Sequence, residues 1–292
     1  MSEKKNVGFI GLGDIGRPMA KHLVTDAYNV YVFDLVQAAL DELAELGARP
    51  CASVGELAAA CSHVGICVRD DAQVESVLHG DDGVLANAAP GTVVAIHSTV
   101  TQASLVRWVE EAAAKKLRLI DTPITGGASG AEAATLCYMV GGTEEDLAAV
   151  TPVFMTSGEK VVHAGPVGSG IALKLCNNYM QYAEFVVLAE AARLADACGL
   201  SLDVIKEVGI ANGVVNPQMH QFVSGRNGLA PACSDEQMVE IFGGFATLAR
   251  KDMDCALETA EQNGVIMPTA EFIRDRIEDV FYARDESRPP AQ

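Results

Sequence analysis

Short runs of apolar residues alternate with segments of helical periodicity through the first part of the chain. The runs are too short for helices, and turn residues border them, so we interpret them as strands. Strands that are apolar throughout and separated by helices are typical of a parallel sheet covered on both faces. We predict strands at residues 7–10, 30–33, 64–68, 92–96, 117–120, 135–141 and 160–163, and helices at residues 18–25, 36–46, 54–60, 72–78 and 102–115.

The pattern changes after Gly170. Residues 171–197 contain neither glycine nor proline, and they keep small and apolar residues throughout, which predicts one unusually long helix. Residues 225–234 are the most loop-like part of this half. Further helices are predicted at residues 202–208, 216–223, 245–262 and 269–281. We therefore expect two domains, an α/β domain at residues 1–166 and an all-α domain at residues 167–292, joined by the long helix.

A glycine-rich turn follows the first predicted strand and opens the first predicted helix. This context is the one that a dinucleotide-binding G-x-G-x-x-G motif requires. Gly11 suits the tight turn, Gly13 lets the backbone approach a pyrophosphate, and Gly16 lets helix and strand pack closely. Free N–H groups at the helix start would face the phosphates. The residues predicted to bind the cofactor here are Gly11, Leu12, Gly13, Asp14, Ile15 and Gly16.

Asp34 ends the second predicted strand. A carboxylate at this place accepts hydrogen bonds from the ribose hydroxyls of NAD and repels the 2′-phosphate of NADP. The residues that follow, Leu35 to Gln37, include no arginine. The sequence therefore predicts a Rossmann domain that binds NAD. The alternative is a glycine turn with an unrelated surface aspartate.

The formal net charge of −18 makes nucleic acid and anionic membranes improbable partners. The apolar runs are shorter than a membrane span, so we expect no membrane insertion. The eight cysteines form no C-x-x-C pair and no cluster with metal-ligand spacing. They are interpreted as free thiols, which favours a cytoplasmic location and argues against a metal.

Polar residues interrupt the apolar start of the long helix. Lys174 and Asn178 are four residues apart and share one helix face, and Asn177 lies nearby. A lysine beside an apolar pocket can lose its proton and act as a base. The loop from Asp121 to Ala128 offers a hydroxyl and consecutive glycine amides, which can bind a carboxylate. An ordinary helix surface and a simple tight turn explain these two segments equally well.

Three motifs in order carry a family resemblance: Gly8 to Met19, Asp121 to Glu132, and Gly168 to Asn178, with a weaker fourth at Lys251 to Met253. On these motifs the chain resembles the β-hydroxyacid dehydrogenases, the family of 3-hydroxyisobutyrate dehydrogenase. The resemblance implies an NAD-dependent oxidoreductase acting on a short 3-hydroxy acid. It also implies assembly into a homodimer or homotetramer.

The resemblance implies roles for particular residues. Lys174 would be the general acid/base, and Asn178 would hold the substrate beside it. The residues implied to bind the substrate are Thr125, Gly126, Gly127, Asn177 and Lys251. The residues implied to line the cofactor site, besides the glycine-rich turn and Asp34, are Val68, Ser98, Thr99 and Lys251.

Three departures from the family pattern concern the substrate. Thr125 stands where the family usually has serine, and Arg69 stands where it typically has proline. Ile96 and His97 replace an aspartate and a small or apolar residue, so His97 and Arg69 are candidates for extra substrate contacts. A larger or uncharged alcohol, an imine reductase-like activity, and a non-enzymatic dinucleotide-binding adaptor remain as alternatives. Imine reductases and adaptors of this kind usually lack the lysine that this chain has at Lys174.

Overall fold

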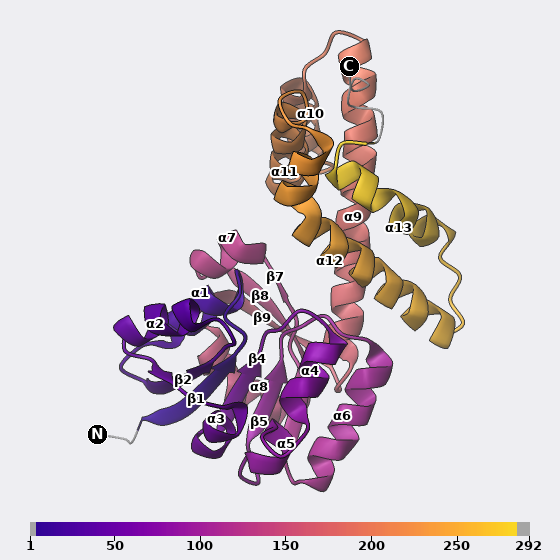
Figure 1. Ribbon diagram of the computed structural model, residues 1–292. Coiled ribbons are helices and arrows are strands. Elements are labelled where there is room, and N and C mark those ends of the chain that lie inside the picture. The colour runs from indigo at the N-terminus through magenta and orange to yellow at the C-terminus, as the bar shows by residue number, and fades with distance from the viewer. Residues whose placement is uncertain (1–3, 285–292) are drawn as a thin grey trace. The chain divides into compact units, whose positions relative to one another are not determined.

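The computed structural model describes residues 4–284, which divide into two compact units that meet between Lys174 and Leu175. The N-terminal unit combines a sheet with helices, and the C-terminal unit is built from helices in its described part (Figure 1). This confirms the predicted fold class. The units meet later in the chain than the predicted domain boundary at residues 166 and 167, because the start of the long helix is hydrogen-bonded to the sheet.

The sheet of the N-terminal unit has the strand order β3-β2-β1-β4-β5-β6, all parallel. This order reverses direction between β1 and β4, which is the arrangement of a Rossmann domain. Beyond β6 the sheet continues through β8, which is antiparallel to β6 and β7 and parallel to β9. The strands are β1 (Lys5–Ile10), β2 (Tyr28–Phe33), β3 (Arg49–Pro50), β4 (His63–Ile66), β5 (Val93–Ile96), β6 (Arg118–Asp121), β7 (Ile124–Thr125), β8 (Leu136–Gly141) and β9 (Gly158–Gly165).

Helices cover both faces of this sheet. All residues of β4 and β5 are buried, as expected for strands with a helix layer on each side. Val7 and Phe9 belong to one core with α1, α2 and α8, whereas Gly8, which points the other way, faces Leu57 of α3. The helices of this unit are α1 (Gly16–Leu23), α2 (Gln37–Glu45), α3 (Val54–Ala60), α4 (Asp71–Leu78), α5 (Val84–Asn87), α6 (Gln102–Ala114), α7 (Gly127–Glu132) and α8 (Glu144–Phe154).

Helix α8 has no counterpart among the predicted helices, although its start carries a sequence signal. Thr143 and Asp146 form a capping box, in which each side chain bonds the backbone N–H of the other residue. Pro152 lies within the helix, and proline in a helix interior normally argues against one. The buried face, which includes Phe154, packs into the core and offsets that cost.

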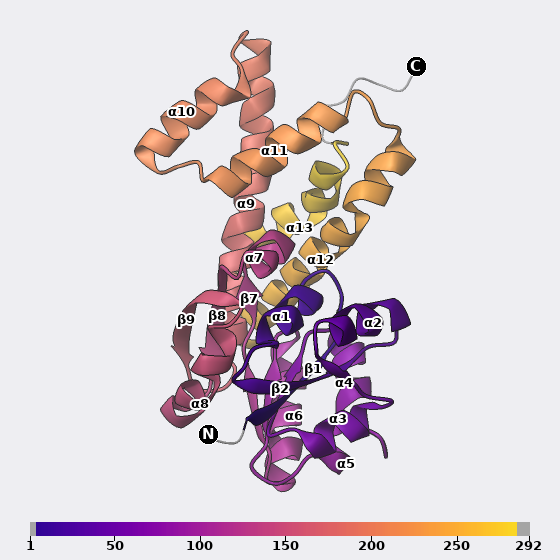
Figure 2. The ribbon, with the colours of Figure 1, turned by 90° about the vertical axis from the view of Figure 1, so that its left-hand side faces the viewer.

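Up to residue 284, the C-terminal unit contains the remainder of α9 and four further helices. Its core is formed by the middle of α9 together with α11, α12 and α13, and α12 packs against α13 (Figure 2). The helices are α9 (Ser169–Ala197), α10 (Leu202–Asn212), α11 (Pro217–Leu229), α12 (Asp235–Gln262) and α13 (Pro268–Phe281).

The predicted loop at residues 225–234 is confirmed only for residues 230–234. Helix α11 continues to Leu229, and α12 begins at Asp235 rather than at residue 245. Two glycines lower the helix propensity here. The fully buried side chain of Arg226 overrides that preference, because it donates a hydrogen bond of 2.8 Å to the carbonyl oxygen of Val280 on α13. A capping box between Ser234 and Gln237 then starts α12.

Candidate active site

The glycine-rich turn lies at the carboxyl end of β1, beside the point where the strand order reverses. Gly11 has φ of +93°, and a Cβ there would collide with the carbonyl of Cys67. A Cβ on Gly16 would collide with the carbonyl of Gly11, so this glycine lets α1 approach the strand. A Cβ on Gly13 would meet nothing within 4 Å. Packing within the chain therefore does not explain Gly13, whereas the close approach of a dinucleotide phosphate does.

The carboxylate of Asp34 closes this turn. Its Oδ2 accepts a hydrogen bond of 2.5 Å from the backbone N–H of Leu12, and Oδ1 accepts one of 2.8 Å from that of Val36. Asp34 follows β2, the neighbour of β1, so the carboxylate lies where a Rossmann domain binds the ribose of its cofactor. The next side chain, Leu35, is 92% exposed and carries no charge that could pair with a 2′-phosphate.

Val68 and Ser98 follow the neighbouring strands β4 and β5 and are bonded to each other. The hydroxyl of Ser98 accepts a hydrogen bond of 2.9 Å from the Val68 N–H and donates one of 2.7 Å to the Val68 carbonyl. Ser98 is buried, and Thr99 is partly exposed. The Ser98 hydroxyl thus shapes the loop after β4, and the cofactor role that the resemblance implies for Ser98 stays a prediction. Arg69, next to Val68, is exposed and stays a candidate for a substrate contact.

The loop after β6 presents a hydroxyl and two glycine amides in succession. Thr125 belongs to β7 and pairs with Cys137 of β8, which fixes its backbone while its side chain stays partly exposed. Gly126 and Gly127 both have positive φ and lead into α7. A Cβ on Gly127 would meet nothing within 4 Å, so the backbone is open to a ligand at this position. Such consecutive N–H groups form a concavity that suits an anion.

The same loop is tied to the start of α9 by Asp121, the last residue of β6. The Asp121 side chain is fully buried, with Oδ1 accepting from the Gly168 N–H and Oδ2 from the Ile171 N–H, both at 2.8 Å. Burial raises the pKa of this carboxyl above its usual value, and the hydrogen bonds from the backbone N–H groups of Gly168 and Ile171 offset part of that shift. Lys174 follows on the first turns of α9 and is partly buried. From the sequence, Asp121 is only the first residue of the loop, and the sequence gives no sign of its bonds to α9.

A second polar cluster lies within the C-terminal unit. The Nδ2 of buried Asn178 donates a 2.6 Å hydrogen bond to Asp252 Oδ2, which also accepts one of 3.2 Å from the Tyr182 hydroxyl. Lys251 Nζ lies 3.5 Å from the other oxygen of Asp252, and Asn177 donates to Asn178 Oδ1 at 3.3 Å. The structure therefore brings Asn177, Asn178 and Lys251 together around Asp252.

Neither Asp252 nor Tyr182 had been assigned a role from the sequence. Burial and the neighbouring Asp252 raise the pKa of Tyr182 well above its usual value, so this phenol stays protonated and donates. Within α9, Lys174 and Asn178 are one turn apart on an uninterrupted helix, as their spacing predicted.

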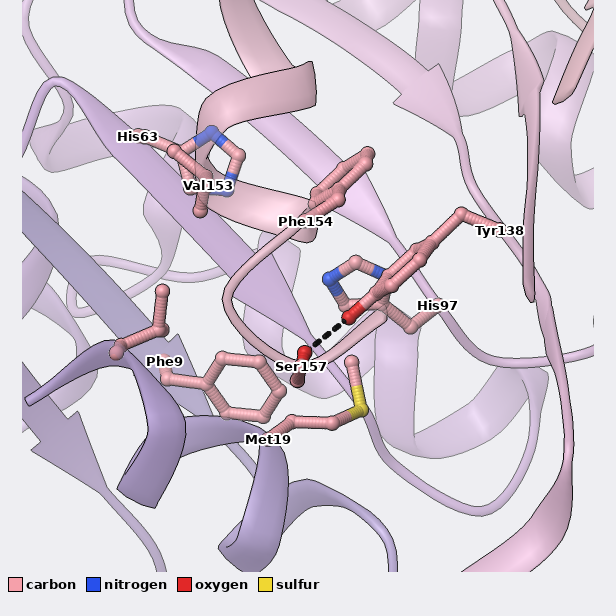
Figure 3. A pocket seen from close by; sticks show the side chains of 9 residues that line it. Phe9, Met19, His63, His97, Tyr138, Val153, Phe154 and Ser157 are labelled. Carbon is pink, nitrogen blue, oxygen red and sulfur yellow. Dashed lines mark hydrogen bonds between the residues drawn. The ribbon is translucent and has the colours of Figure 1, made fainter. Parts of the chain in front are cut away.

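His97 does not reach toward a substrate, and its interpretation as an extra contact is wrong. Its ring lies in the core of the N-terminal unit, stacked on Phe9 at 5.8 Å between centroids, with Tyr138 and Phe154 at its edges (Figure 3). The Nδ1 atom lies 3.1 Å from the Thr122 carbonyl oxygen. Burial lowers the pKa of His97 to about 4. The residues in Figure 3 line a cavity of about 10 Å³, which is a packing gap too small for a metabolite.

Residues 4–284 contain no group of histidine, cysteine, aspartate and glutamate side chains placed to hold a metal ion. None of the helices in this range is both long and apolar enough to cross a bilayer. The fold and the glycine-rich turn define the chain as a dinucleotide-binding protein of the Rossmann class.

Comparison with known sequences identifies both halves of the chain. Residues 6–165 match the NAD binding domain of 6-phosphogluconate dehydrogenase, and residues 168–286 match the family described as NAD-binding of NADP-dependent 3-hydroxyisobutyrate dehydrogenase. The chain belongs to the 3-hydroxyisobutyrate dehydrogenase-like family of β-hydroxyacid dehydrogenases, which are oxidoreductases acting on CH–OH donors.

Individual relatives cover nearly the whole chain. The NAD-dependent L-serine dehydrogenase of Pseudomonas aeruginosa is 36% identical over 267 residues, which cover 90% of this chain and 88% of that protein. The 2-(hydroxymethyl)glutarate dehydrogenase of Eubacterium barkeri is 33% identical, covering 92% and 86%. A solved structure of Mycobacterium tuberculosis 3-hydroxyisobutyrate dehydrogenase with L-serine has a TM-score of 0.81 at 27% identity, covering 98% and 96%.

Proposed function

We propose that this protein catalyses the reversible, NAD-dependent oxidation of a short 3-hydroxy acid to the corresponding aldehyde or ketone. The observation that carries the proposal is the bond through Asp121 between the anion-binding loop at Thr125 and the helix of Lys174. A hydroxy acid requires a site that binds its carboxylate and a base for its hydroxyl. Both would thereby belong to the N-terminal unit, joined by the two hydrogen bonds of Asp121.

The named relatives support the position of the hydroxyl. L-serine and 2-(hydroxymethyl)glutarate, after which two relatives are named, both carry a CH₂OH group on the carbon next to a carboxylate. Their other substituents differ in size and charge. We therefore expect the carboxylate and the β-hydroxyl to be the recognised groups here, with the third substituent decided by the residues around Thr125 and Arg69.

In the proposed reaction the substrate carboxylate accepts hydrogen bonds from the Thr125 hydroxyl and the amides of Gly126 and Gly127. Neutral Lys174 takes the proton of the hydroxyl group while the C–H bond breaks. Bound NAD⁺ supplies the acceptor for the hydride. Asn178, with its amide held by Asp252, donates or accepts a hydrogen bond at the reacting oxygen, and Asn177 and Lys251 complete the substrate contacts. In the reverse direction Lys174 returns the proton to the alcohol oxygen.

We assign NAD rather than NADP as the cofactor and residues 1–166 as the domain that binds it. The carboxylate of Asp34 suits ribose hydroxyls, and the exposed side chain after it is apolar. The remaining cofactor contacts are assigned to the glycine-rich turn, Val68, Ser98, Thr99 and Lys251.

We assign assembly to residues 167–292 and propose a homodimer or homotetramer. Large apolar side chains are more than half exposed along α9 and α10, including Val187, Leu194 and Val208. A second copy of the chain would remove this surface from water. We propose a cytoplasmic location, because the eight cysteines include no C-x-x-C pair. Light scattering after gel filtration measures the assembly, and a monomer at micromolar concentration would contradict it.

The substrate class is tested by NADH formation with pairs of compounds that differ in one group. The isomers 3-hydroxypropionate and lactate compare the β- and α-hydroxyl, and L-serine with its methyl ester compares the presence of the carboxylate. We expect turnover of the 3-hydroxy acids with NAD⁺ and little with lactate, the ester or NADP⁺. Equal turnover of the ester would show that an uncharged alcohol is the substrate. NADH binding without turnover of any compound would favour the adaptor.

A further inference from the structure

We propose that Asp121 is a positioning residue that sets the place of Lys174 relative to the carboxylate-binding loop. The inference rests on the proposed function, and it concerns how the two halves of that site are held in register. The buried side chain of Asp121 contacts the start of the Lys174 helix, and Asp121 immediately precedes the loop that holds Thr125, Gly126 and Gly127.

The backbone of Asp121 is fixed from both sides. In the sheet it pairs with Ile96 of β5 in parallel and with Gly141 of β8 in antiparallel register. Residues 122 and 123 follow this anchored point, and β7, at residues 124 and 125, then pairs with β8. The glycine amides of residues 126 and 127 follow β7 directly, so the main chain just before them is held at two sheet positions.

The side chain of Asp121 makes the other connection. Its two oxygens accept from the N–H groups of Gly168 and Ile171, which are 47 and 50 residues away in the chain. The first N–H groups of a helix have no partner within the helix and bind carboxylates well. In α3, α4 and α6 such groups are bonded by the residue just before the helix, namely Ser53, Asp70 and Thr101. In α9 the residue that accepts these hydrogen bonds is Asp121 of β6, so the bonds hold the start of the helix against the sheet.

Two glycines make room for this carboxylate. A Cβ on Gly141 would overlap the Asp121 carboxyl group, and a Cβ on Gly170 would lie 2.9 Å from Asp121 Oδ2 and 2.5 Å from the Met139 carbonyl oxygen. The first turn of α9 therefore lies directly against the sheet backbone. Any larger side chain at either place would push the helix away from β8.

Lys174 follows Ile171 by three residues, which is less than one helical turn. A displacement of the Ile171 backbone therefore moves Lys174 by a similar distance. A misplacement of about 1 Å in a reacting group can cost about 10²-fold in rate. Asp121 does not need to touch the substrate to have this effect. Its two hydrogen bonds set the distance between the Lys174 amine and a substrate whose carboxylate is bound by the loop.

The test compares Asp121→Asn with the wild type in the full-length protein. The asparagine keeps the shape but directs an NH₂ group at one of two N–H donors, so one bond is lost. We expect kcat for the best 3-hydroxy acid to fall by about 10- to 100-fold. The Kd for NADH should change by less than about twofold, because the glycine-rich turn and Asp34 are untouched. Amide hydrogen exchange in residues 168–174 should become faster by at least about tenfold.

The control is Asp146→Asn, which removes the carboxylate from the capping box at the start of α8 in the same unit. It should lower the midpoint of thermal unfolding without changing kcat, and so separates lost stability from lost positioning. If Asp121→Asn does not fold, Gly170→Ala serves as the second variant. It leaves all charges in place and displaces the same helix start, and we expect the same loss of kcat with normal NADH binding.

A double-mutant cycle with Lys174→Ala decides whether the effect passes through the lysine. In the Lys174→Ala background, Asp121→Asn should lower the remaining rate by less than about threefold. Losses that multiply, or wild-type kcat in Asp121→Asn despite faster exchange at residues 168–174, would overturn the proposal. Full activity of Lys174→Ala alone would instead refute the proposed function and the positioning role with it, while the exchange result would still report on the Asp121 bonds.

Discussion

The two buried histidines of the N-terminal unit make its stability depend on pH in a calculable way. Burial, together with the nearby His97, lowers the pKa of His63 to about 3, and burial lowers that of His97 to about 4. Unfolding returns both rings to a pKa of about 6.5. Below that value the unfolded chain takes up protons that the folded chain refuses. The stability is therefore complete above pH 6.5 and falls as the pH drops toward 4.

The magnitude follows from the two pKa values of each group. Between pH 7 and pH 5, each histidine lowers the free energy of unfolding by about 2 kcal/mol, and the pair lowers it by about 4 kcal/mol. At pH 5 this result depends on the unfolded pKa alone, because both folded values lie below 5. The carboxyl of Glu75, whose pKa Arg107 and Trp108 hold at about 2 against a smaller effect of burial, loses its contribution only below about pH 4.5.

The assay is urea unfolding followed by tryptophan fluorescence at a series of pH values. Trp108 is the single tryptophan of the chain and is fully buried in the N-terminal unit, so its emission reports the unfolding of that unit. The free energy of unfolding should fall between pH 6 and 5 with a slope near two protons. His97→Phe, which keeps a ring stacked on Phe9, should reduce that slope to about one.

Phe9→Leu is the matched control, because it removes the stacked ring and no titrating group. It should lower the stability by a similar amount at pH 7 and pH 5. An unfolding free energy that stays constant from pH 7 to 5, or an unchanged slope in His97→Phe, would refute the placement of neutral histidines in this core.

Three further predictions concern ligand binding. Gly13→Ala should weaken NADH binding with no loss of stability, because its Cβ meets only open space, whereas Gly16→Ala should lower the unfolding midpoint as well; equal stability of the two variants would contradict this. Asp34→Ala should raise the Kd for NADH by about 10²-fold and bring it close to that for NADPH in fluorescence titrations, and an unchanged preference would remove Asp34 from the site. Asp252→Ala should raise KM for the hydroxy acid and destabilise the C-terminal unit by about 2–4 kcal/mol, because Asn178 loses the acceptor of its amide; an unchanged KM would argue against that role.

The buried strands and the long helix were predictable, because the sequence of each shows a clear pattern of apolar residues. The strands at residues 7–10 and 93–96 are apolar throughout, and the long helix lacks glycine and proline. The end of α11 was not predictable, because its two glycines argue for a loop and the hydrogen bond from buried Arg226 to the Val280 carbonyl joins residues far apart in the chain. Helix α8 was missed although Thr143 and Asp146 give the pattern of a capping box.

Within the candidate site, local motifs were recovered and distant connections were not. The glycine-rich turn, Asp34 and the Lys174–Asn178 spacing are short-range patterns with a known physical purpose. The bond from Asp121 to Gly168 and the bond from Asn178 to Asp252 each join residues far apart in the chain, and a single sequence holds no sign of such pairing. The direction of His97 likewise depends on how the strand before it faces the core.

The central claim is that Lys174 moves the proton in a hydroxy acid dehydrogenase, and one comparison of steady-state rates tests it. Lys174→Ala is measured against Lys160→Ala, a change at an exposed lysine of β9 outside the proposed site, with the best 3-hydroxy acid and saturating NAD⁺. We predict that Lys174→Ala binds NADH as the wild type does and loses at least about 10²-fold in kcat, whereas Lys160→Ala keeps full activity. A Lys174→Ala enzyme that retains more than about a tenth of the wild-type kcat would contradict the account.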